Sequence, residues 1–132
     1  MTAKESLGKA ELELLQLVEK LQPAAVRTLV EHLAESSGLA RTTVITMLER
    51  LRRKGFLTRR KIQGMNHYSP RVSVPALMQR LVGDFIQKML GGSVSPVVAY
   101  LQDANTINAT ELAELKQLVQ QLEDQQATKG AK

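Results

Sequence analysis

The stretch that decides the fold is residues 40–55, which read ARTTVITMLERLRRKG. At about 100° per residue, a helix over Arg41–Lys54 places its apolar side chains on one side. These are Val44, Met47, Leu48 and Leu51. The opposite side carries short threonines followed by arginines, namely Thr42, Thr43, Thr46, Arg50 and Arg53. Gly55 suits the position after the helix because glycine readily adopts a left-handed conformation. The stretch therefore predicts an amphipathic helix with a hydroxyl-rich, cationic outer face.

Two shorter helices are expected before this one. Apolar side chains at helical spacing predict the first over about Lys9–Leu21 and the second over about Ala24–Glu35. Gln22–Pro23 separates the two, since proline cannot continue a helix. Ser36–Ser37–Gly38 ends the second helix, and its glycine suits a left-handed turn. The second and third helices are thus joined by a short turn, as in a helix-turn-helix.

A basic hairpin is expected after the third helix. Phe56–Ile62 and Met65–Ser69 are typical of two short strands around the tight turn Gln63–Gly64, and Pro70 ends the second strand. Three helices followed by such a hairpin are the order of a winged helix-turn-helix. The sequence therefore predicts a mainly α fold that begins with this winged-helix unit.

A tight turn in which Ile62 opposes Met65 would set the register of the hairpin. It places Arg60 opposite His67 and Arg59 opposite Tyr68. Because side chains alternate between the two faces of a strand, Leu57 and Tyr68 are expected to share the inward face. Arg60 and His67 share the other face, where contact with a phosphate is the expected role of His67.

The positive charge of the chain is concentrated around this helix and hairpin. The 132 residues carry 18 lysines and arginines against 13 aspartates and glutamates, a net charge of +5. Residues 1–75 hold 13 basic and 7 acidic side chains, whereas residues 76–132 hold 5 and 6. From Arg41 to Lys61, eight basic side chains accompany one glutamate, Glu49. Such a patch favours a polyanionic partner, although a solvated face of lysines and arginines would have the same composition.

The outer face of the third helix has the chemistry that the major groove of DNA requires. Threonine hydroxyls reach phosphates or base edges, and threonine methyls pack on the methyl group of thymine. Arginines further along the helix reach phosphates or guanine. Short side chains at the start of the helix also let it approach the groove closely. The alternative is a helical hairpin whose polar face meets only solvent.

The composition changes after Ser73, which suits the cap of a helix that starts near Val74. From Leu77 to Leu90 apolar residues come in pairs at helical spacing, and Gly91–Gly92 ends this run. A shorter helix is expected over about Ser95–Gln102.

A last helix is expected to start after residues 108–111, which resemble a capping box. The polar residues after it are expected to fray. The sequence therefore predicts three parts: a winged-helix domain over residues 1–73, a helical dimerisation domain over residues 74–124, and a flexible polar tail over residues 125–132.

About fifty residues in three helices cannot easily bury this much apolar surface alone. A second copy of the chain is the simplest cover, so the segment is predicted to form a homodimer. The predicted interface side chains are Leu77, Leu81, Phe85, Met89, Val97, Leu101, Leu112, Leu115, Val119 and Leu122. The alternative is a monomer in which these helices pack back onto the first domain. The stripe from Met78 to Met89 is interpreted as interface rather than as a surface for a hydrophobic ligand.

Composition excludes several kinds of site. With no cysteine, the chain has no disulfide, thiolate metal site or cysteine nucleophile. No catalytic constellation and no glycine-rich phosphate loop appears, so neither an enzyme nor a cofactor is expected. His32 and His67 belong to different elements and have no second ligand at a suitable spacing, so no metal site is expected. The longest unbroken apolar run, Val97–Leu101, is too short to span a bilayer, and no signal peptide is seen, so a cytoplasmic protein is expected.

Residues 40–55 resemble the recognition-helix motif of the penicillinase-repressor family, which includes the methicillin-resistance and copper-transport repressors. The similarity continues through residues 57–59, 68–70, 91–94 and 110–115. Leu7–Glu11 also matches the opening helix of the family. The similarity spans nearly the whole chain, from about Leu7 to Glu123.

This resemblance implies a dimeric winged-helix repressor that binds a palindromic operator in double-stranded DNA and blocks transcription. By position, the start of the third helix would read or approach the groove through Arg41, Thr42, Thr43 and Thr46. The end of the helix would hold phosphates through Arg50, Arg53 and Lys54, and the wing around Arg60 would touch the flanking backbone.

The sequence departs from the family pattern in three places. Antibiotic-resistance members are inactivated by proteolysis at an Asn–Phe bond, and Ala99–Tyr100 occupies the matching positions here. Copper-responsive members carry a Cys-x-Cys motif, and this chain has no cysteine. The wing tip often has an arginine, and Gly64–Met65–Asn66 occupies that region. The inducing signal and any regulatory protease are therefore left open.

Two functions of different classes remain. One is a homodimeric transcriptional repressor that reads a palindromic operator. The other is a winged-helix adaptor between proteins that does not read DNA. They differ in whether the outer face of the third helix is needed for sequence-specific binding.

Overall fold

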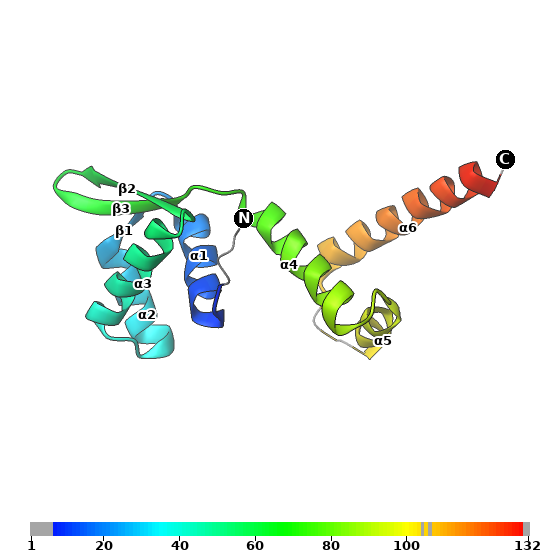
Figure 1. The fold of residues 1–132 in the computed structure, drawn as a ribbon, viewed down its shortest axis with the longest axis horizontal. Coiled ribbons are helices and arrows are strands. Elements are labelled where there is room, and N and C mark those ends of the chain that lie inside the picture. Colours follow the sequence, from blue (N-terminus) through cyan, green and yellow to red (C-terminus); the bar gives the residue numbers. More distant parts are fainter. Residues whose placement is uncertain (1–6, 104, 106, 131–132) are drawn as a thin grey trace. The chain divides into compact units, whose positions relative to one another are not determined.

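A computed structural model describes residues 7–103, 105 and 107–130. The first compact unit ends at Gly83 and the second begins at Asp84. The first unit contains three helices, α1 (Lys9–Leu21), α2 (Val26–Ser37) and α3 (Arg41–Arg53), and a hairpin of strands β2 (Leu57–Ile62) and β3 (Met65–Pro70). Figure 1 shows the hairpin extending beyond the helices as a wing. The predicted winged helix-turn-helix is therefore confirmed.

The three-stranded sheet has the order β1-β3-β2, and all its pairs are antiparallel. Arg60 pairs with His67 and Arg59 with Tyr68, as the two-residue turn predicts. Strand β1 (Ala24–Ala25) was not predicted. These two residues were expected to begin the second helix, but they pair with β3, so α2 begins at Val26.

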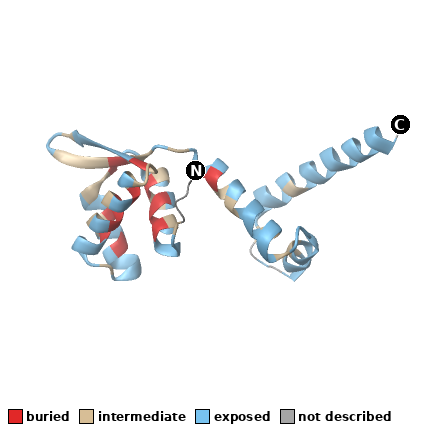
Figure 2. Cartoon of the chain, viewed as in Figure 1, coloured by how far each residue is buried: buried red, intermediate tan, exposed pale blue. Residues whose placement is uncertain are grey.

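One hydrophobic core holds the first unit together, and its buried side chains come from the three helices, strand β1, the base of the hairpin and the start of α4 (Figure 2). Leu57 and Tyr68 are both buried in it, as predicted. Helix α4 (Val74–Met89) begins directly after Ser73, as expected, and the Ser73 hydroxyl accepts a hydrogen bond from the Ala76 amide at 3.2 Å. Val74 and Leu77 are buried in the same core. The first compact unit therefore extends past the expected boundary at residue 73, because the first turn of α4 completes its core.

The second unit contains the end of α4, helix α5 (Ser95–Asp103) and helix α6 (Ala109–Gly130). The capping box predicted for α6 is present, since the Glu111 amide donates to Asn108 Oδ1 at 2.8 Å and the Asn108 amide to Glu111 Oε1 at 3.3 Å. Helix α6 continues through residues 125–130, where a flexible tail was expected. The sequence there contains no proline, and the Thr128 hydroxyl donates to the Asp124 carbonyl at 3.0 Å.

Candidate nucleic-acid interface

Helix α3 presents its polar side to solvent and its apolar side to the core. The buried side chains are Val44, Met47, Leu48 and Leu51. The exposed side chains of the opposite side are Arg41, Thr42, Thr43, Thr46, Arg50 and Arg53. Packing therefore fixes the helix by its apolar side and leaves the threonines and arginines together on one outward surface.

Glu49 links this helix to the wing. Its carboxylate accepts hydrogen bonds from Arg52 in α3 at 2.8 and 3.0 Å, from Arg59 in β2 at 2.9 Å and from the Tyr68 hydroxyl in β3 at 2.6 Å. The Glu49 side chain is 21% exposed, so these charge-assisted bonds are partly shielded from water. One carboxylate thus holds the wing against the end of α3.

The same contacts shift two pKa values. Burial raises the pKa of Glu49, but the hydrogen bonds from Arg52 and Tyr68 and the charges of Arg52 and Arg59 outweigh it, so the pKa falls from 4.5 to about 2. Burial, followed by the hydrogen bond to Glu49, raises the pKa of Tyr68 to about 12. Glu49 is therefore ionised and Tyr68 is a hydrogen-bond donor over the physiological range.

Glu11 in α1 holds a second set of cations. Its carboxylate accepts hydrogen bonds from the Lys54 ammonium at 3.1 and 3.3 Å and from the Gly8 amide at 3.1 Å. Arg50 Nη1 lies 3.7 Å from Glu11 Oε2. Burial raises the pKa of Glu11, yet the hydrogen bonds from Gly8 and Lys54 and the charges of Lys54 and Arg50 lower it overall. Lys54, expected to hold a phosphate, thus lies against a carboxylate and is only 21% exposed.

The two glutamates divide the basic patch into two groups. Four of its eight cations form ion pairs with Glu11 or Glu49: Arg50, Arg52, Lys54 and Arg59. Over the described ranges, no carboxylate forms an ion pair with the other four, which are Arg41, Arg53, Arg60 and Lys61. In the described ranges, the charge of the second group is therefore not offset by an ion pair.

The wing places Arg60 and His67 as predicted. Arg60 is exposed, and His67 is partly buried with its Nδ1 2.9 Å from the Met65 carbonyl oxygen. Both line one hollow with Pro23, Thr58, Arg59 and Ser69. Gln63 and Gly64 form the turn with φ values of 52° and 79°, which favours glycine at the second position. The face predicted to contact phosphate is therefore concave and cationic.

The predicted dimerisation residues have very different exposures. Five are exposed: Phe85, Met89, Leu112, Val119 and Leu122. Leu81, Val97, Leu101 and Leu115 are partly buried. Leu77 is only 5% exposed because it belongs to the core of the first unit. Leu77 therefore stabilises the first unit, and its side chain is not presented to a partner.

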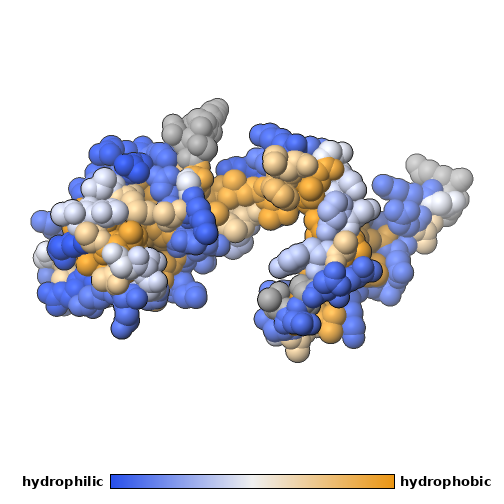
Figure 3. Space-filling model, turned by 90° about the horizontal axis from the view of Figure 1, so that it is seen from below, coloured by the Kyte–Doolittle hydropathy of each residue, from blue (hydrophilic) through white to orange (hydrophobic). Residues whose placement is uncertain are grey.

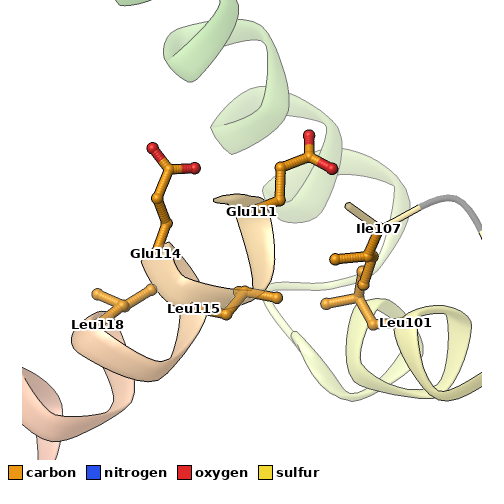
Figure 4. A pocket seen from close by; sticks show the side chains of 6 residues that line it. All are labelled: Leu101, Ile107, Glu111, Glu114, Leu115 and Leu118. Atoms are coloured by element: carbon orange, nitrogen blue, oxygen red, sulfur yellow. The ribbon is translucent and has the colours of Figure 1, made fainter. Parts of the chain in front are cut away.

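Apolar side chains of the second unit lie exposed on α4, α5 and α6, among them Phe85, Met89, Val98 and Val119, and Figure 3 colours such side chains orange. A hollow in this unit is lined by Leu101, Ile107, Glu111, Glu114, Leu115 and Leu118. The carboxylates of Glu111 and Glu114 point away from Leu115 and Leu118 (Figure 4). Tyr100 is exposed and lies within α5.

In the part of the chain that the structure describes, no three histidine or acidic side chains lie close enough together to hold a metal ion. No described helix is both long and apolar enough to cross a membrane.

Three helices packed around one core and followed by a hairpin are the arrangement of winged helix-turn-helix proteins. Here the third helix exposes threonines and arginines beside a basic hairpin. The family described as penicillinase repressor matches residues 7–121, and the chain belongs to this family. The family is one of transcriptional repressors, not of enzymes, and the resemblance seen in the sequence is confirmed.

Individual relatives agree with this assignment. The penicillinase repressor of Bacillus licheniformis is 23% identical over 87% of this chain and 90% of its own length. The methicillin resistance regulatory protein MecI of Staphylococcus aureus is 21% identical over 86% of this chain and 92% of its own. The solution structure of the DNA-binding domain of the repressor BlaI matches with a TM-score of 0.50 and 27% identity, over 55% of this chain and 89% of that one.

Proposed function

We propose that this chain is a homodimeric transcriptional repressor that binds a palindromic operator. The observation that carries the proposal is the outward face of α3, where three threonines and three arginines lie exposed on one side of a helix. Threonines at the helix start read base edges in the major groove, and arginines beyond them reach phosphates or guanine. Such a target implies that the protein works in the cytoplasm, beside its DNA.

The wing supports the same function. Arg60 and His67 lie beside each other on the free face of the hairpin, and Glu49 fixes the hairpin to α3. A hairpin held in this way touches the backbone that flanks the major-groove site. Phosphate contacts of this kind position a protein on DNA without reading its sequence.

The uncovered apolar side chains of the second unit support a dimer. Phe85 is 53% exposed and Met89 69% exposed, and further apolar side chains follow along α6. Exposed apolar surface of this extent is typical of an interface. A two-fold symmetric pair presents two recognition helices in opposite directions, so its DNA site is an inverted repeat.

Salt dependence tests the proposal. If the dimer neutralises about six to ten phosphates, the logarithm of the binding constant falls with the logarithm of salt concentration at a slope of about −5 to −9. The measurement is fluorescence anisotropy with an operator selected from random DNA. A slope near zero, or equal affinity for every sequence, would leave the adaptor function as the better account.

Replacing Thr46 separates reading of sequence from attraction to phosphate. Thr46→Ala is expected to weaken operator binding by about 1–3 kcal/mol per half-site while leaving non-specific binding nearly unchanged. The control is Thr128→Ala, because Thr128 is also an exposed helical threonine but lies near the end of α6. If Thr46→Ala changes operator affinity no more than Thr128→Ala does, Thr46 does not read the operator.

A further inference from the structure

The structure brings three cations from three elements around one hollow. Arg27 lies in the first turn of α2, Arg41 is the first residue of α3, and Lys61 lies near the end of β2. Together with Val26 and residues 64–66 of the wing tip, they line a hollow of about 370 Å³. Arg27 lies outside the basic run of residues 41–61, and only the fold brings it to the wing tip.

The charge of this hollow is uncompensated within the protein. No carboxylate is among its lining residues, and over residues 7–103, 105 and 107–130 none of the three cations forms an ion pair. Like charges gathered in this way repel one another, and an anion placed between them relieves the repulsion. Asn66 adds a neutral amide to the lining, so the hollow offers hydrogen-bond donors as well as charge.

The position of the hollow indicates which anion it meets. It lies between the start of α3 and the tip of the wing. When a recognition helix occupies the major groove and a hairpin reaches towards the neighbouring minor groove, the strand that separates the two grooves passes between them. That strand presents a row of phosphodiester groups. Arginine recognises such a group through its planar fork of donors, and lysine through its point charge.

We propose that Arg27, Arg41 and Lys61 clamp one phosphodiester of the operator backbone between the recognition helix and the wing. This inference rests on the proposed function and adds to it a site at the wing tip, where the sequence has no arginine of its own. The two neighbouring elements supply the arginines in its place. The clamp contributes affinity on any DNA sequence and fixes how far the recognition helix turns into the groove.

Two single-charge variants test the clamp in the full-length protein. Arg27→Gln and Lys61→Gln are each expected to lower affinity for operator and for non-specific DNA by the same factor, about three- to tenfold. Each is also expected to make the salt slope less negative, by at most about 2, which is the full contribution of one phosphate in each half of the dimer. Lys20→Gln is the control, because Lys20 is an exposed cation of α1 that does not line the hollow. Circular dichroism and thermal melting confirm that each variant is folded.

Operators with one uncharged methylphosphonate group locate the contact. Stepping this group along each strand should reveal one position per half-site at which Arg27→Gln and Lys61→Gln lose clearly less affinity than the wild-type protein does. The same position for both variants supports the clamp. Additive losses at every position, or effects no larger than those of Lys20→Gln, would overturn it.

Two further outcomes separate the inference from other accounts. Binding of inorganic pyrophosphate to the hollow can be measured by NMR shifts of its side chains. If pyrophosphate binds there while both variants bind operator normally, the hollow takes a free anion and the clamp is wrong. If the wild-type protein selects no DNA sequence at all, the proposed function itself fails. A wild-type protein that binds its operator specifically, with variants that show no coupling, would contradict only the clamp.

Discussion

A chain that ends at Gly83 is expected to remain folded and monomeric and to bind the operator at least about 100-fold more weakly than the full chain. The first compact unit ends at this residue and contains its whole core, including Val74 and Leu77. What is lost is the exposed apolar surface of α5, of α6 and of the end of α4, which carries Phe85 and Met89. Joining two half-site readers makes the second contact intramolecular, which raises overall affinity by about 10²–10⁴.

Sedimentation equilibrium and anisotropy on whole and half operators measure both effects. The shortened chain should bind a half-site as well as the full chain does. A matched chain that ends at Arg71 should also be monomeric but less stable by about 3 kcal/mol or more, because it lacks two side chains of the core. A chain 1–83 that is still dimeric, or that binds the whole operator with full affinity, would contradict the assignment of the interface.

Glu49→Ala is expected to lower the free energy of unfolding by about 2–4 kcal/mol. The substitution leaves the Tyr68 hydroxyl, in a side chain only 1% exposed, without its acceptor, and it releases Arg52 and Arg59. Removing the shared acceptor leaves its donors without a partner in a partly buried place. The free-energy cost of such unpaired donors exceeds the net stabilisation that each intact hydrogen bond provides. Urea unfolding followed by circular dichroism measures the change. Tyr68→Phe is the milder comparison, since it removes one hydrogen bond and keeps the ring.

The pH dependence of stability gives a second measurement of the same contact. The pKa of Glu49 is about 2 in the folded chain and 4.5 ordinarily. A carboxyl whose pKa is lowered by folding stabilises the protein above its unfolded value, and this contribution is lost as the pH falls from about 4.5 to about 2. Glu11, whose pKa is also lowered, acts in the same direction. Wild-type stability should therefore fall more steeply over this window than that of Glu49→Ala, and parallel curves would contradict the role of Glu49.

Much of the first unit follows from local sequence patterns. The apolar positions of α3 repeat at helical spacing, and the turn at Gln63–Gly64 determines the register of the wing, so both could be predicted. The cap of α6 at Asn108 could also be read from four consecutive residues. Strand β1 could not be read in this way, because two alanines become a strand only by pairing with residues that lie more than forty positions further on.

Pairing between charges was the main feature that local patterns did not reveal. Glu11 and Lys54 are 43 positions apart, and only packing of α1 against α3 brings them together. Arg27 reaches the wing tip for the same kind of reason. Glu49 could have been singled out as the one acidic residue among eight basic ones, a pattern that suggests a structural ion pair. The charge count thus predicted a polyanionic partner. The fold adds which cations form ion pairs with carboxylates and which, among the described residues, form none.

The measurement that tests the central claim most directly is selection of random double-stranded DNA by the intact chain. The account predicts an enriched inverted repeat whose half-sites lie about one helical turn of DNA, or a multiple of it, apart. Thr46→Ala should lose preference within the half-sites and keep their spacing. Enrichment of no sequence, or of a single site without symmetry, would contradict a dimer that reads DNA through α3.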